Sequence, residues 1–104
     1  MKYLDYINAF WHEAYSRPFS AGQIALYFAI LDSVNHNFWQ EWTSISLHMM
    51  ACRIDMTVAG TQKAKEALVK RGIIDYRIGE NGNCGEIKLL IPKKENDNQQ
   101  GNVS

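Results

Sequence analysis

The spacing of the apolar residues changes at Gly72, and this change constrains the fold more than any other feature of the sequence. In residues 58–71, apolar and small side chains recur every three or four positions, as on one side of a helix. In residues 73–78 and 86–91 they alternate with polar side chains, as in strands with one buried face. The intervening segment 79–85 is rich in glycine and asparagine and predicts a hairpin turn. A helix followed by a β-hairpin is therefore expected here.

Two helices are predicted in the first third of the chain. Residues 3–15 carry one apolar stripe, made up of Leu4, Ile7, Phe10, Trp11 and Ala14. Pro18 ends this helix, because proline disfavours helical geometry in the residue before it. Ser20 followed by Gln23 is the sequence of a capping box and predicts the next helix start. Apolar residues cover most of that second helix, so we expect it to form the buried centre of the domain.

The middle of the chain predicts a short strand and two further helices. The strand is expected at residues 43–45. Ser46 is suited to cap a helix that runs to about residue 53, with an inward face of Leu47, Met50, Ala51 and Ile54. After a tight turn, Thr57 caps the helix at 58–71. Two short helices joined by a few residues form the outline of a helix-turn-helix.

This order of elements predicts a winged helix-turn-helix fold, mainly α with a small β-hairpin. The sequence has 104 residues, of which 46% are hydrophobic, and this length suits one compact domain. We place that domain at residues 1–92. Residues 93–104 are polar and are expected to form a disordered tail or part of a linker.

The charge is divided unequally, although the formal net charge is zero. Residues 1–52 carry two basic and four acidic side chains, whereas residues 53–94 carry nine basic and five acidic ones. The remaining two acids lie in the tail. Such an asymmetry can orient a domain on a polyanion, although scattered solvated charges would give the same count.

Several classes of function have no support in the sequence. The longest apolar run, residues 24–31, is far shorter than the ~20 residues of a membrane-spanning helix, and the N-terminus does not resemble an export signal, so we expect a cytoplasmic protein. Cys52 and Cys84 have no CxxC spacing and are expected to be reduced thiols, and the three histidines have no metal-ligand spacing. No nucleophile–base pattern or phosphate loop is present, so neither an enzyme nor a cofactor or metal is predicted.

Several stretches resemble one protein family. These are Phe10-Trp11, the segment FSAGQIALY at 19–27, Asn35 and the segment WQEW at 39–42, and they resemble the N-terminal winged-helix domain of DnaD-like primosome proteins and phage replisome organisers. The resemblance covers about residues 3–92. It implies replication initiation or primosome assembly in a phage or mobile element, with double-stranded DNA and replication proteins, such as an initiator or a helicase loader, as partners. Members of the family often have a second helical domain that binds DNA, which this sequence lacks.

The outward face of helix 58–71 supplies the predicted DNA contacts. In a helix-turn-helix the N-terminal half of the second helix enters the major groove, and the wing contacts the flanking backbone. Gln62 is suited to an adenine edge and Lys63 to a guanine or a phosphate, while Thr57 and the free amides near it suit a phosphate. The complete set of predicted contacts is Thr57, Val58, Ala59, Gln62, Lys63, Glu66, Lys70, Arg77, Asn81, Asn83 and Lys88.

Other interpretations stay open. The same fold serves as a protein-interaction or oligomerisation module, and three tryptophans in so small a domain leave one available for an interface between copies. Gln62 and Lys63 are also ordinary solvated helix residues, and the sequence does not separate a replication role from that of a transcriptional regulator.

Overall fold

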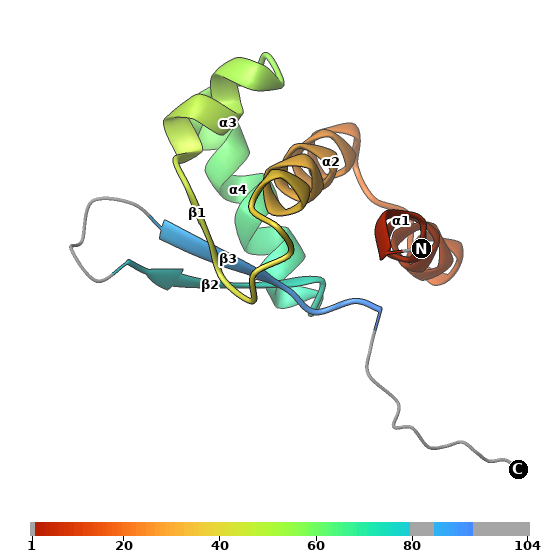
Figure 1. The fold of residues 1–104 in the computed structure, drawn as a ribbon. Coiled ribbons are helices and arrows are strands. Elements are labelled where there is room, and N and C mark those ends of the chain that lie inside the picture. Colours follow the sequence, from red (N-terminus) through yellow and green to blue (C-terminus); the bar gives the residue numbers. More distant parts are fainter. Residues whose placement is uncertain (1, 80–84, 93–104) are drawn as a thin grey trace, which may run out of the picture.

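The computed structural model describes residues 2–79 and 85–92 of the chain. Helices and strands follow one another in the order that the sequence predicts (Figure 1). They are α1 (Lys2–Ser16), α2 (Ala21–His36), β1 (Thr43–Ile45), α3 (Leu47–Arg53), α4 (Val58–Lys70), β2 (Ile74–Ile78) and β3 (Gly85–Leu89).

Three helices begin at the residues that the sequence marks as caps. The Ser20 hydroxyl accepts from the Gln23 amide, and the Gln23 side chain accepts from the Ser20 amide at 3.1 Å, which completes the capping box of α2. Ser46 caps α3 by accepting from the Met49 amide. Thr57 caps α4, and Gly72 beyond the end of α4 has a φ of 76°, a conformation that favours glycine. All three predicted helix starts are confirmed.

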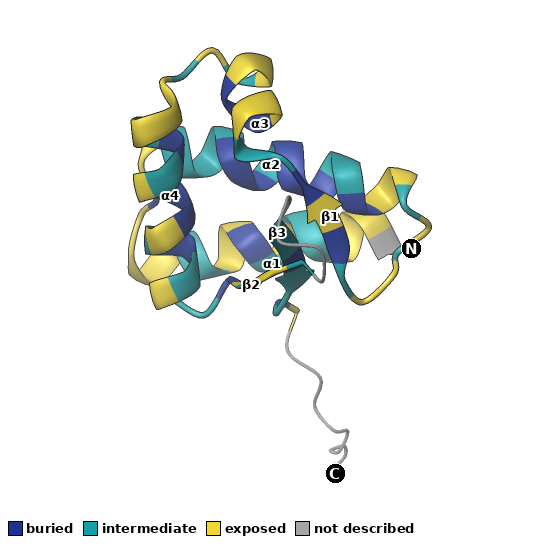
Figure 2. Cartoon of the chain, turned by 90° about the vertical axis from the view of Figure 1, so that its left-hand side faces the viewer, coloured by how far each residue is buried: buried dark blue, intermediate teal, exposed yellow. Residues whose placement is uncertain are grey.

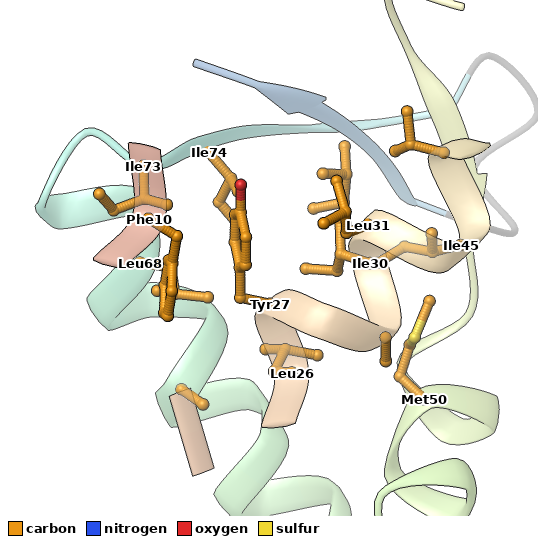
Figure 3. Close-up of a cluster of buried hydrophobic side chains, with 14 of the residues drawn as sticks. Phe10, Leu26, Tyr27, Ile30, Leu31, Ile45, Met50, Leu68, Ile73 and Ile74 are labelled. Carbon is orange, nitrogen blue, oxygen red and sulfur yellow. The ribbon is translucent and has the colours of Figure 1, made fainter. Parts of the chain in front are cut away.

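The core is built around α2, as predicted. Its buried side chains are Leu26, Tyr27, Ala29, Ile30, Leu31 and Val34. Figure 3 shows this helix between side chains of α4, the sheet and α1. Phe10 of α1 stacks on both Phe19 and Tyr27, with ring centroids 4.2 Å apart in each pair. Leu68 of α4 is completely buried in the same cluster.

The predicted stripe of α1 is only partly buried. Phe10 is fully enclosed and Ile7 and Ala14 are half-buried, but Leu4 is 53% and Trp11 44% exposed. Figure 1 shows α1 at the margin of the fold, packed on one side only. The neighbours of α1 on that side do not cover the whole stripe, so an apolar surface remains on the outside of α1.

The sheet has three strands, in the order β1-β3-β2, all antiparallel. The predicted hairpin of β2 and β3 is confirmed, with Ile74 opposite Leu89 and Ile78 opposite Gly85. Pairing of β1 with β3 was not predicted. Ile78 was expected on the buried face but is 70% exposed, because the hairpin extends beyond the helices that cover its other end (Figure 1).

The coarse fold class is therefore confirmed: the described chain is mainly helical with a small antiparallel sheet. The predicted tail, residues 93–104, and the predicted hairpin tip with Asn81, Asn83 and Cys84 lie outside the described residues.

Candidate nucleic-acid interface

The two sides of α4 are sorted as the sequence predicts. Thr61, Ala64 and Leu68 are buried against the rest of the fold. Figure 2 shows the buried, dark blue segments of α4 on its inner side. Val58, Ala59, Lys63, Glu66 and Lys70 are exposed on the other side, and Gln62 is half-exposed. Six of the predicted contact residues thus share one accessible helix face.

The first turn of α4 keeps two amides available. The Thr57 hydroxyl accepts from the Gly60 amide at 2.9 Å, and the Thr57 carbonyl accepts from both the amide and the hydroxyl of Thr61. Within the described chain, the amides of Val58 and Ala59 have no acceptor. Free amides at a helix start attract anions, because they add to the positive end of the helix dipole.

Two of the predicted DNA-contacting side chains contact each other. The Gln62 side-chain amide donates to the Glu66 carboxylate at 2.9 Å. This bond fixes the amide beside a negative charge, one turn along the helix. A nucleobase edge would therefore have to use the second N–H and the oxygen of this side-chain amide, or else replace Glu66 as its partner.

The predicted hairpin cations are held in ion pairs on one face of the sheet. Arg77 donates to Glu86 at 2.6 Å, and its guanidinium lies 4.0 Å from the centre of the Trp42 ring. Lys88 pairs with Glu41 at 2.8 Å and lies 5.8 Å from the same ring. The positive charge predicted for the wing is thus already balanced by neighbouring carboxylates.

Sequence reasoning missed these partners, although part of the signal was present. Arg77 and Glu86 lie directly opposite each other once the hairpin is in register, and opposite charges in that arrangement attract. Glu41 and Trp42 reach the hairpin only because β1 joins β3, which no local pattern indicated.

Lys65 is the one cation of α4 that faces inward. Its side chain is only 7% exposed, and its ammonium lies 3.6 Å from the centre of the Tyr76 ring. Loss of water on burial lowers the pKa of Lys65, and the neighbouring Glu66 carboxylate partly opposes that shift. Residues 61, 64, 65 and 68 have the spacing of a buried helix face, so this spacing could have predicted that Lys65 faces inward.

The Arg71 side chain is also used for contacts within the fold. Its guanidinium lies 3.7 Å from the centre of the Phe19 ring and donates to the carbonyls of Arg17 at 2.7 Å and Pro18 at 3.3 Å. These bonds join the end of α4 to the segment between α1 and α2. The same enclosure, with Arg17 nearby, lowers the pKa of Arg71.

In the basic half of the described chain, only Lys63 and Lys70 have no ion pair or ring contact. Arg53 pairs with Asp32 at 3.2 Å, and the other described cations are held as above. Both remaining lysines lie on the exposed side of α4. Within the described part of this half, the basic side chains that have no ion pair or ring contact therefore all lie on one helix.

The described residues contain no cluster of metal ligands, no membrane-spanning helix and no disulfide. Within residues 2–79 and 85–92, no three histidine, cysteine, aspartate or glutamate side chains are grouped to hold a metal ion. None of the described helices is long and apolar enough to cross a bilayer. Cys52 is exposed and not in a disulfide.

Comparisons of the chain with models of protein families, with curated proteins and with solved structures found no match.

Proposed function

We propose that this chain is a winged-helix DNA-binding domain that acts in replication initiation or primosome assembly of a phage or mobile element. The observation that carries the proposal is the outer face of α4, where Lys63, Lys70 and the free amides of the first turn all face solvent. In this interpretation α3 and α4 form the helix-turn-helix, and the β2–β3 hairpin is the wing.

The shape of the domain supports α4 as the DNA-reading helix. Helix α4 is 13 residues long, and the buried Leu68 holds its inner side against the core. The N-terminal half of α4 lies away from the sheet (Figure 1). Val58 and Ala59 offer few hydrogen bonds to base edges, so contacts to phosphates are expected to outnumber contacts to bases. The assignment to replication rests on the resemblance to DnaD-like proteins, and a transcriptional regulator would use the same face.

Salt dependence of DNA binding tests this proposal. Fluorescence anisotropy of a labelled duplex and of a single strand, each about 30 nucleotides long, is measured at about 50 and about 200 mM salt. We expect duplex binding that weakens as salt rises, with a slope of about −0.9 per phosphate contact. Lys63→Gln should lower the slope by about one contact, whereas Arg17→Gln, a matched loss of charge in the segment between α1 and α2, should leave it unchanged.

Glu86→Gln provides the opposite change. It removes the carboxylate that pairs with Arg77 while keeping a side chain of nearly the same size. If the hairpin lies against DNA, the freed guanidinium gains a phosphate contact and duplex affinity rises. Glu13→Gln changes the net charge equally on α1 and should not raise it. Unchanged binding in both Lys63→Gln and Glu86→Gln would refute the proposed face.

A protein-interaction module without DNA contact is the second candidate, and one observation favours it. Leu4, Trp11 and Tyr15 follow one another at intervals of seven and four residues along α1, so they share one side of this helix, and they are 53%, 44% and 88% exposed. Phe38, in the loop after α2, is 85% exposed. Absence of DNA binding at low salt, together with a mass above that of one chain by light scattering, would favour this candidate. The surface would then join copies of the chain in a homo-oligomer.

A further inference from the structure

The outer edge of β1 presents backbone groups that the sheet does not use. Residues opposite each other in an antiparallel pair alternate between bonded and non-bonded positions. The Leu90 amide donates to the Ile73 carbonyl, which shows that odd residues of β2 bond to even residues of β3. Gly85 and Ile87 consequently bond toward β1, where they face Ile45 and Thr43. The amide and carbonyl of Ser44, between these two residues, point away from the sheet.

On the opposite edge of the sheet one outward amide is already hydrogen-bonded, whereas the described outward groups of β1 are not. On β2 the outward-facing Tyr76 amide donates to the carboxylate of its neighbour Asp75 at 2.8 Å. Within the described chain, the outward amide and carbonyl of Ser44 have no such partner. An unpaired strand edge is a template for another strand, and proteins usually cover or block it. Figure 2 shows β1 on the near side of the molecule, in front of α2.

Two adjoining depressions run beside Ser44. Their volumes are about 470 and 160 Å³, and both are lined by Ser33, Ser44 and Arg53. The larger one continues along α2 to Asp32 and His36, and the smaller one continues to Met49 of α3. A strand added at Ser44 would therefore have room for side chains on both sides of the bonded residue.

The lining indicates which side chains fit. Arg53 has five N–H donors but makes one hydrogen bond within the described chain, from Nη1 to Asp32 at 3.2 Å, and its side chain is 53% exposed. The remaining donors suit a second carboxylate, held in bidentate fashion beside the Asp32 carboxylate that Arg53 already pairs with. Met49 is 71% exposed and offers a flexible apolar surface at the other depression.

We propose that the β1 edge and the two depressions bind an extended, acidic peptide segment of a partner protein by strand addition. The backbone of the peptide pairs with Ser44, an acidic side chain binds Arg53, and an apolar side chain contacts Met49. This surface uses none of the residues proposed to contact DNA, so the proposal stands or falls separately from DNA binding.

Selection from a displayed library of random peptides, about ten residues long, tests the proposal. The enriched peptides are synthesised with a fluorescent label, and their affinity for the protein is measured by anisotropy. We expect them to share an acidic residue within a stretch of β-branched or aromatic residues. Arg53→Gln should weaken their binding about tenfold, whereas Lys70→Gln, a loss of charge on α4, should not change it.

Two further variants test the backbone contact itself. Ser44→Pro removes the outward amide and is therefore expected to abolish peptide binding. The fold should tolerate this substitution, because proline is accepted at an open strand edge where the amide has no partner in the fold. If circular dichroism shows that this variant is unfolded, N-methylation of alternate peptide bonds in the ligand gives the same information. Methylation in one register should abolish binding, and methylation in the other register should leave it intact.

Three outcomes would overturn the proposal. The first is a library that yields no binding peptide. The second is a set of peptides whose affinity depends neither on Arg53 nor on the register of methylation. The third is a dimer in light scattering that Ser44→Pro dissociates, since a second copy would then occupy the edge in place of a partner segment.

Discussion

Replacing Gly85 by alanine tests how the hairpin is held against α4. Gly85 lies on β3 beside the ring of Tyr76, and the ammonium of Lys65 lies on Tyr76 as well. A Cβ atom at residue 85 would overlap ring carbons and the hydroxyl of Tyr76. A ring cannot bend away as the end of a flexible chain does, so Tyr76 must leave its position. The Lys65 ammonium then loses its contact with the ring and becomes more exposed to water.

The expected cost of Gly85→Ala follows from three contributions. Forcing a side chain out of a packed position costs about 1–3 kcal/mol. Loss of the ammonium–ring contact adds about 0.5–2 kcal/mol. Removal of a glycine from a strand returns about 0.5–1 kcal/mol. The net loss is about 2 kcal/mol, which lowers the melting temperature of a domain of this size by about 10 °C.

Thermal and urea unfolding, followed by circular dichroism, measure this loss in two backgrounds. In the Tyr76→Ala background there is no ring to displace, so Gly85→Ala should be neutral or slightly stabilising. The titration of Lys65, followed by NMR, provides a second measurement: its lowered pKa should return toward 10.5 in Gly85→Ala. An equal loss of stability in both backgrounds would refute the role assigned to the Tyr76 ring.

Three other substitutions test the core, the alkaline limit of stability and the start of α4. Leu68→Ala should destabilise the domain by about 2–5 kcal/mol in urea unfolding, because Leu68 is fully buried; a loss below about 1 kcal/mol would contradict the packing of α4. Burial, with a smaller contribution from Tyr6, raises the pKa of the Tyr27 phenol well above its ordinary value of 10.0. Both states keep this proton below pH 10, but above it the unfolded chain releases the proton first, so stability should fall as the pH rises further. Tyr27→Phe removes this contribution, and urea unfolding of both proteins at several pH values between about 8 and 11 should show their difference shrinking or reversing above pH 10. Thr57→Ala removes the acceptor of the Gly60 amide and should cost about 1 kcal/mol; the same stability as the parent protein would show that the cap contributes nothing.

Local signals predicted the elements of this fold well. The capping residues Ser20, Ser46 and Thr57 each accept a hydrogen bond from an amide three positions further on, so neighbouring residues of the sequence suffice to predict the caps. The same holds for the buried side of α4, where the spacing of apolar residues fixes which side faces inward. Lys65 shares that spacing and is buried too, but a charged residue on an apolar face is easily assigned to solvent.

The contacts that decide the candidate interface are not local. Trp42 and Glu41 contact the hairpin only after β1 pairs with β3, whose partner residues are 40 to 44 positions apart in the sequence. Register within the hairpin pairs Arg77 with Glu86, and it could be estimated only from the length of the turn. Sequence reasoning therefore placed the hairpin cations on the correct side of the sheet but not in the ion pairs that hold them.

The use of charge within the fold bears directly on how strongly this domain can bind DNA. A count over residues 53–94 gives an excess of positive charge, but the cations that the structure describes in this range, other than Lys63 and Lys70, are paired, buried or stacked on rings. Two free lysines correspond to a salt slope of about −2, which is far below that of proteins that make six to ten phosphate contacts. Through the outer face of α4 alone, a single copy is therefore expected to bind DNA weakly. Strong binding at physiological salt would require contacts beyond this face, from other basic residues, from several copies on one duplex or from a partner, for which the β1 edge is the proposed place.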